Sequence, residues 1–201
     1  TTFVQHSFKN TPNLRNLTVI SSGNIDFQDE CFIDSNVNNI ELYTNGTVRF
    51  VQHSFKNTQN LTNLTIYSKG EIDFQNECFI NSTVNTMELY TNGTVTFIQD
   101  AFKNTRNLTY FEIHSIGNIE FKTLAFQNSN VNVIDLYTNG QVIFGYQAFL
   151  NCANLTTLTI HSPSDVTFGI ESFLNSQIEE LNVTWENGTN GAIYLSTPST
   201  I

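Results

Sequence analysis

The chain has 201 residues, of which 39% are hydrophobic, and a net charge of −10 from 18 acidic and 8 basic side chains. This acidity argues against nucleic acid and anionic membranes as partners, because both need a basic surface. No apolar run approaches the ~18 residues of a membrane-spanning helix, so we expect no membrane insertion in this segment. The remaining polarity comes mainly from asparagine, serine and threonine, which suits an extracellular or cell-surface protein better than a cytosolic enzyme.

The sequence repeats every 47 residues. Residues 3–49 and 50–96 agree at 35 of 47 positions. Each repeat divides into units of 24 and 23 residues, and every unit carries a phenylalanine at the same point: Phe8, Phe32, Phe55, Phe79, Phe102, Phe126, Phe149 and Phe173. Self-similarity at this period is typical of a solenoid, in which each coil buries its apolar face against its neighbours. We therefore predict about eight coils of 23 or 24 residues, arranged as 47-residue double repeats.

The elements of one coil follow from its hydrophobic pattern. In the first coil, residues 8–14 lack β-alternation and are expected to form a helical or 3₁₀ turn. Residues 17–19 and 25–27 alternate with period two, which predicts two short strands with one face inward. Between them, Gly23 is expected to supply the positive φ of a tight turn. Stacking such coils at about 4.8 Å gives parallel sheets along a rod roughly 40 Å long.

The repeat pattern changes near its carboxyl end. The solenoid is predicted over residues 1–184, and residues 185–201 are interpreted as a degenerate final coil and a linker or tail. At the other end, the sequence opens in the middle of a repeat, with no polar capping coil. Two explanations stay open, namely a piece of a longer array or end-to-end self-association. End-to-end stacking does not close on itself, so it would produce a fibril.

The coil pattern resembles the BspA-like, or Treponema-type, leucine-rich repeat. The stretches that carry the resemblance most clearly are AFLNCANL at residues 148–155 and SPSDVTFG at residues 162–169. The family cysteine is threonine or serine in most coils, and the family proline appears once, as Pro163. The resemblance implies a β-rich leucine-rich-repeat solenoid of parallel short strands and helical or 3₁₀ turns. It also implies an adhesive or interaction role at a cell surface, without a particular ligand.

The cysteines fall into structural columns of the repeat. Cys31 and Cys78 occupy the small position before the marker phenylalanine, and Cys152 occupies a threonine or serine position. We expect buried thiols, no disulfide and no metal site, because Cys31 and Cys78 lie two coils apart. Ser and Thr are spread evenly along the rod, so no catalytic residues and no cofactor are predicted, and the protein is not expected to be an enzyme.

A tyrosine column and an acidic column run side by side along the predicted strands. The tyrosines are Tyr43, Tyr67, Tyr90 and Tyr137, and the carboxylates are Glu41, Glu88, Glu112 and Asp135. Tyrosine together with carboxylate can bind a glycan or a cationic protein patch, so these residues are the candidate ligand-binding site. The alternative is that stacked tyrosines only stiffen the sheet through cross-strand packing.

Ten Asn-x-Ser/Thr sequons are candidates for N-glycosylation: Asn16, Asn45, Asn60, Asn63, Asn81, Asn92, Asn107, Asn154, Asn182 and Asn187. Asn45 and Asn92 recur in Tyr-Thr-Asn-Gly-Thr, at a predicted exposed turn where a glycan has room. Asn-Gly is equally a plain turn signal. Five asparagines precede a leucine expected to be buried and are interpreted as harder to reach: Asn16, Asn60, Asn63, Asn107 and Asn154.

These features predict a non-catalytic, glycosylated extracellular or cell-surface repeat protein. The first interpretation of its function is a structural role, as a surface fibril, filament or adhesive stalk. The alternative is a binding module, an adhesin or receptor, that recognises a protein or glycan through the tyrosine and acidic columns.

Overall fold

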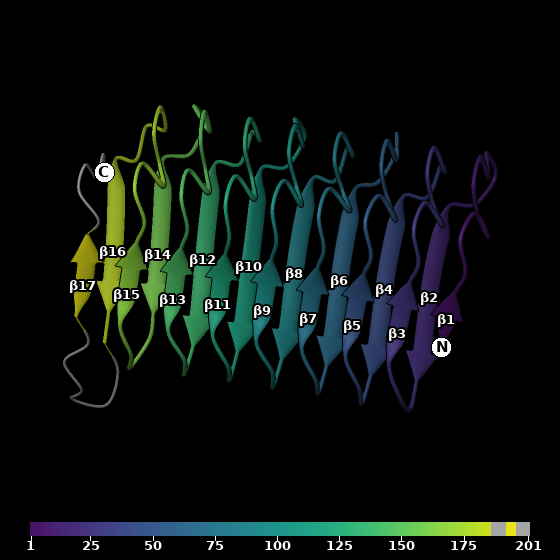
Figure 1. Cartoon of the computed structure of the whole chain (residues 1–201), viewed down its shortest axis with the longest axis horizontal. Coiled ribbons are helices and arrows are strands. Elements are labelled where there is room, and N and C mark those ends of the chain that lie inside the picture. The colour runs from purple at the N-terminus through teal and green to yellow at the C-terminus, as the bar shows by residue number, and fades with distance from the viewer. Residues whose placement is uncertain (186–191, 196–201) are drawn as a thin grey trace.

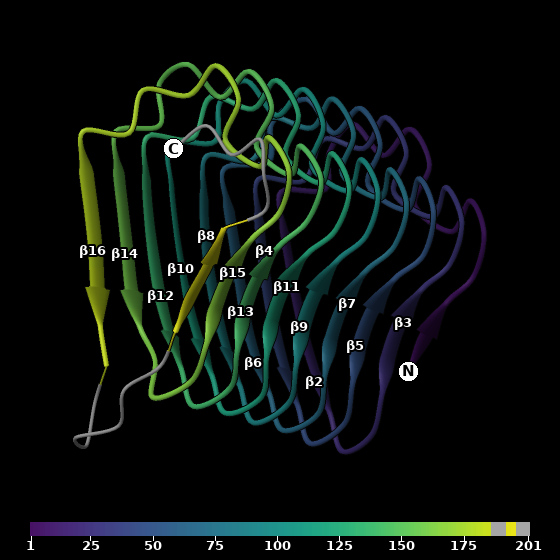
Figure 2. The ribbon, with the colours of Figure 1, turned by 60° about the vertical axis from the view of Figure 1, so that its left-hand side comes forward.

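The computed structural model describes residues 1–185 and 192–195. The chain winds as a solenoid whose strands form two parallel sheets that face each other along the rod (Figures 1 and 2). The wide sheet has eight strands of five or six residues: β2 (Asn16–Ser21), β4 (Asn39–Thr44), β6 (Asn63–Ser68), β8 (Thr86–Thr91), β10 (Tyr110–Ser115), β12 (Val133–Thr138), β14 (Thr157–His161) and β16 (Glu180–Thr184).

The narrow sheet has nine strands of two or three residues. They are β1 (Thr2–Phe3), β3 (Ile25–Phe27), β5 (Val48–Phe50), β7 (Ile72–Phe74), β9 (Val95–Phe97), β11 (Ile119–Phe121), β13 (Val142–Phe144), β15 (Val166–Phe168) and β17 (Ile193–Leu195). The two predicted strands of each coil are thus confirmed, one in each sheet. β17 pairs with β15 and lies within residues 185–201, most of which fall outside the described residues.

Strand alternation separates the core from the outer faces. In β4, Ile40, Leu42 and Thr44 are buried, whereas Glu41 and Tyr43 point outward and are exposed. The strands pair in register, so residues at one repeat position form a column that crosses the sheet. The inward columns therefore make one continuous core, and the outward columns make a continuous surface.

Stacked phenylalanines hold the coils together. All phenylalanines except Phe111 fall into two core columns. Within one column Phe27 and Phe50 stack with centroids 5.0 Å apart and ring planes at 6°, and within the other Phe32 and Phe55 stack at 4.6 Å and 7°. Between the columns, Phe27 meets Phe55 edge-on at 5.1 Å. Aromatic pairs of this kind add about 0.5–1.5 kcal/mol each beyond the burial of their area.

The segment expected to be helical is a series of reverse turns instead. Within residues 1–185 and 192–195 no segment is helical. The reason is that His6 and Asn10 have φ values of 61° and 53°, and a right-handed helix needs consecutive negative φ. Successive amides alternate between two kinds of partner: Phe8 N–H donates to Cys31 C=O of the next coil at 2.8 Å, whereas Lys9 N–H donates to His6 C=O of its own turn at 3.2 Å. The predicted helical or 3₁₀ turn is therefore wrong, although the predicted solenoid is present.

An asparagine ladder stabilises the second left-handed position. Asparagine tolerates positive φ better than other side chains that carry a Cβ, and it occupies this position in most coils. The ladder begins at Asn57 Oδ1, and each later Nδ2 donates a hydrogen bond of 2.8–3.2 Å to the Oδ1 of the preceding coil, from Asn81, Asn104, Asn128, Asn151 and Asn175. The same residue type thus satisfies both the backbone conformation and the contact between coils.

The turn glycines, expected to supply a positive φ, allow neighbouring turns to approach closely instead. Gly93 does not adopt positive φ; a Cβ at this position would lie 2.7 Å from the backbone carbonyl carbon of Gly70 in the preceding coil. Gly23, the equivalent glycine of the first coil, has no atom within 4 Å of its ideal Cβ. The glycine column therefore permits the close approach of consecutive turns.

This difference gives a matched pair of substitutions. Gly93→Ala should lower the free energy of unfolding by about 1–3 kcal/mol, because the added methyl forces neighbouring turns apart. Gly23→Ala should change the same free energy by less than about 0.5 kcal/mol, because its methyl meets open space. Urea denaturation of both variants measures the difference, and equal effects would contradict the close-approach explanation.

Candidate binding face on the wide sheet

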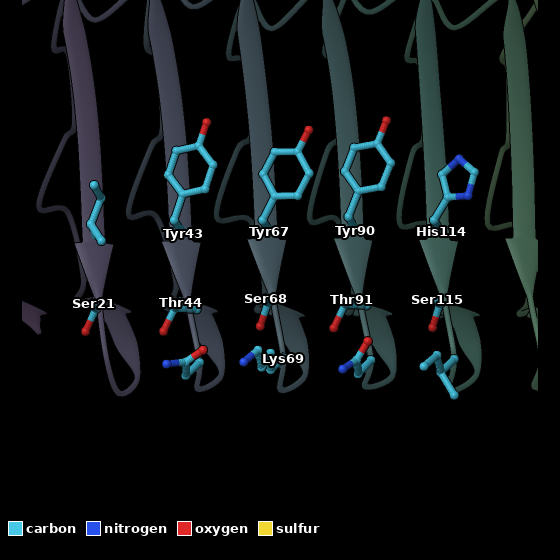
Figure 3. A pocket seen from close by; sticks show the side chains of 14 residues that line it. Ser21, Tyr43, Thr44, Tyr67, Ser68, Lys69, Tyr90, Thr91, His114 and Ser115 are labelled. Atoms are coloured by element: carbon cyan, nitrogen blue, oxygen red, sulfur yellow. The ribbon is translucent and has the colours of Figure 1, made fainter.

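The tyrosine column forms an unbroken stack of rings on the outer face of the wide sheet. Its members, in strand order, are Tyr43, Tyr67, Tyr90, His114, Tyr137 and His161. Consecutive centroids lie 4.5–5.3 Å apart and consecutive ring planes differ by 3–10°. Figure 3 shows the first four rings pointing the same way from neighbouring strands. The predicted ladder is present, and the two histidines, which the candidate set omitted, are full members of it.

The stacking decides which part of each ring a ligand can reach. Interior rings cover one another's faces, so their edges and hydroxyl groups are what remains exposed. Tyr43 and Tyr67 are 37% and 42% exposed. Aromatic ring edges carry partial positive charge and the hydroxyls can donate hydrogen bonds. The stack therefore suits polar or edge contacts better than a sugar ring lying flat on an aromatic face.

The acidic column lies on the same face, two residues before the rings. Glu112 pairs in register with Glu88 on one side and Asp135 on the other, so three carboxylates occupy neighbouring strands. Thr65 separates Glu88 from Glu41, the fourth candidate. Adjacent strands lie about 4.8 Å apart, and like charges directly opposite each other destabilise a sheet.

Two neighbouring side chains are hydrogen-bonded to the carboxylate of Glu112. Tyr110 Oη donates a 3.0 Å hydrogen bond to Glu112 Oε2, and His114 Nε2 is hydrogen-bonded to Oε1. Burial and the hydrogen bond to Glu112 both raise the pKa of Tyr110. Burial raises the pKa of Tyr90 and Tyr137 as well, with Glu112 adding to the effect in both. Glu112 is thus the electrostatic centre of this face.

An open groove runs beside the rings. It has a volume of 570 Å³ and lies between the ring column and the turn residues that follow the strands, which are Asn45, Lys69, Asn92 and Ile116. A smaller hollow continues it along His114, Tyr137 and His161. Sites that bind small ligands commonly measure about 300–1,000 Å³, so the groove is large enough for one.

The floor of the groove offers few free polar groups. Ser68 Oγ donates a 2.6 Å hydrogen bond to the Gly46 carbonyl and accepts one of 3.1 Å from the Gly70 amide. Threonine or serine repeats this arrangement in the neighbouring coils (Figure 3). A ligand would therefore bind mainly to the tyrosine hydroxyls and to the amide and ammonium groups of the wall.

The sequon asparagines lie at the surface. All nine in the described residues are exposed, including the five interpreted as harder to reach because of a neighbouring leucine. Some amides are already engaged, since Asn81 belongs to the asparagine ladder and Asn63 Nδ2 donates a 2.7 Å hydrogen bond to Asn39. Asn187 lies outside the described residues.

The cysteine thiols, the remaining reactive side chains considered, are buried. Cys31, Cys78 and Cys152 are free and inaccessible, and burial raises the pKa of Cys31 and Cys152 to about 12. Among the described residues no group of three or more His, Cys, Asp or Glu side chains could hold a metal ion. In the same part of the chain, no helix is long and apolar enough to cross a membrane.

Comparison with known proteins identifies one family model. The BspA type leucine rich repeat region matches in six copies, over residues 1–132 and 73–192, which together span most of the sequence. Neither the curated proteins nor the solved structures gave a match.

Removing the charge of Glu112 tests the electrostatics of the face. Glu112→Gln should lower the pKa of Tyr90, Tyr110 and Tyr137, because a neutral amide no longer opposes formation of a phenolate nearby. The absorbance of phenolate during alkaline titration reports this shift. Asp73→Asn on the narrow sheet is the control and should leave the titration unchanged. An identical titration curve for Glu112→Gln would contradict the assignment.

Proposed function

Because the chain belongs to the BspA-type leucine-rich repeat family, we propose that it is a non-catalytic cell-surface repeat protein that binds a basic protein segment. The proposed contact is the outer face of the wide sheet. The observation that carries the proposal is the row of Glu88, Glu112 and Asp135 on adjacent strands beside an exposed ring stack. Lysine and arginine side chains would relieve the repulsion between these carboxylates.

The distribution of positive charge supports a cationic partner. On the narrow sheet, Arg49 lies between Asp26 and Asp73, with N–O distances of 3.9 and 3.6 Å, so the acidic residues there are compensated. On the wide sheet, among the residues that the structure describes, the acidic column is paired with His114, which is charged only when protonated. Complementary charge steers a partner to such a face and fixes its orientation.

The proposed location outside the cell rests on the surface chemistry. The exposed sequons and the richness in asparagine, serine and threonine support an N-glycosylated protein in the secretory pathway. The buried thiols with raised pKa and the coil-by-coil repetition of polar groups support a role without catalysis.

A charge-matched pair of variants tests the binding face. Replacing Glu88 and Glu112 by Gln and Asp135 by Asn should weaken binding of a fluorescent oligolysine peptide about tenfold at low salt, since exposed ion pairs contribute about 0.2–1 kcal/mol each. Fluorescence anisotropy measures the affinity. The same variant should unfold at a higher urea concentration, because like charges no longer face each other across the strands.

The control removes three carboxylates from the other sheet. Asp26→Asn, Asp73→Asn and Glu120→Gln together change the net charge equally and should leave peptide affinity almost unaltered. If both triple variants lose affinity to the same extent, binding follows net charge and the wide-sheet face is not the site.

A second candidate is the structural role of a surface fibril or adhesive stalk, in which copies stack end to end. It is favoured by the columns themselves, because the phenylalanine stacks and the asparagine ladder repeat the same contacts from coil to coil. A further copy can continue such contacts without new chemistry.

Imaging separates this candidate from the first. A fibril-forming protein should appear by negative-stain microscopy as particles much longer than the rod of about 40 Å expected for eight coils. Discrete rods of about that length at high protein concentration would contradict self-association and leave the binding face as the functional feature.

A further inference from the structure

Two sequon asparagines lie on the wall of the groove. Asn45 and Asn92 each follow a ladder tyrosine, Tyr43 or Tyr90, by two residues, and both line the groove. Each asparagine is the first residue after its strand, since β4 ends at Thr44 and β8 at Thr91, and the groove places it beside the ring stack. Both asparagines are exposed, and within the described residues neither side-chain amide makes a hydrogen bond. Their amide nitrogens are therefore free for modification.

We propose that N-linked glycans on Asn45 and Asn92 lie over this groove and restrict the ligand to the half of the binding face around Asp135 and Tyr137. This rests on the proposed function, because the covered surface is part of the proposed binding face. In the modification, Asn Nδ2 forms a bond to C1 of a sugar, and the bond from C1 to the diphosphate of a lipid-linked donor breaks. The amide loses one proton, and the lipid diphosphate leaves.

Of the Tyr-Thr-Asn-Gly turns beside the groove and its continuation, the one in the half around Tyr137 carries no sequon. Tyr137-Thr138-Asn139-Gly140-Gln141 repeats the Tyr-Thr-Asn-Gly-Thr sequence except at its last residue, so Asn139 has the same place after a ladder tyrosine but is no sequon. Asn139 lines the hollow next to Tyr137 and His161. The carboxylates also gather toward this half, because Glu88, Glu112 and Asp135 are consecutive whereas Glu41 is separated by Thr65.

The groove suits the first sugars of an attached glycan. Its wall contributes ring edges and the apolar side chain of Ile116, while its floor hydroxyls are already bonded within the protein. An attached sugar therefore needs to displace no existing hydrogen bond. Covalent attachment keeps it close to the groove at high effective concentration, so a weak contact is enough to cover the rings.

Tyrosine reactivity tests the shielding without any ligand. The protein secreted from eukaryotic cells is iodinated under mild conditions, and each tyrosine is followed by peptide mass spectrometry, which also reports the glycans. We expect loss of iodine incorporation at Tyr43 and Tyr90, recovered in the double variant Asn45→Gln and Asn92→Gln. Tyr137 should react equally in both proteins.

Gln141→Thr extends the test to the open half. Threonine already occupies this position after Asn45 and Asn92, so the turn accommodates it. We expect a new glycan on Asn139, loss of iodine incorporation at Tyr137 and loss of oligolysine binding. The double variant Gln141→Thr and Asn139→Gln has no sequon at this turn. It should regain iodine incorporation at Tyr137 and oligolysine binding. Absence of glycan on Asn45 and Asn92, or full reactivity of Tyr43 and Tyr90 in the glycosylated protein, would overturn the proposal.

The unglycosylated protein from bacterial cytosol distinguishes the two proposals. If it binds oligolysine while the glycosylated tyrosines remain reactive, the shielding proposal fails and the binding face stands. If it does not bind oligolysine but the glycosylated tyrosines are protected, the binding proposal fails and the glycans still cover the groove.

Discussion

Each strand residue of the stacked coils has to fit against its counterpart about 4.8 Å away on the next strand. The structure shows three solutions to that constraint. Phenylalanines stack face to face, asparagines donate and accept hydrogen bonds along a ladder, and glycines allow the turns to approach closely. Each solution works best when the next coil carries the same residue, which explains why the repeats are near copies.

The same constraint makes the acidic column informative. Phenylalanine, asparagine and glycine gain from repetition, whereas a carboxylate facing a carboxylate loses stability. The narrow sheet avoids the loss by placing Arg49 between Asp26 and Asp73. The wide sheet keeps Glu88, Glu112 and Asp135 in consecutive strands. The wide sheet thus breaks a rule that the narrow sheet obeys, and such departures are expected at functional sites. This contrast is the main reason to propose a function for the wide sheet.

Periodicity predicts the columns but not the path of the backbone between them. The spacing of Phe8 and Phe32 was enough to find the core, and the alternation in residues 40–43 was enough to place Glu41 and Tyr43 on one outer face. The left-handed φ of His6 carries no clear signal, because the equivalent position holds Glu, Asp, Leu or Gln elsewhere. Contacts between the turns of neighbouring coils are not encoded in the spacing of residues. The close approach at Gly93 and the position of Asn45 on the groove are therefore seen only in the structure.

The rings of the stack are spaced almost evenly along the sheet. Its members recur at nearly constant spacing, with centroids 4.5–5.3 Å apart, so one stretch of the ladder resembles the next. Alternate side chains of an extended peptide lying across the strands recur at about 6.7 Å, and the two periods do not match. A basic segment bound as proposed would therefore meet several nearly equivalent alignments rather than one best fit. Such degeneracy favours a mobile complex that tolerates sequence variation in the partner, with retention decided by the number of positive charges.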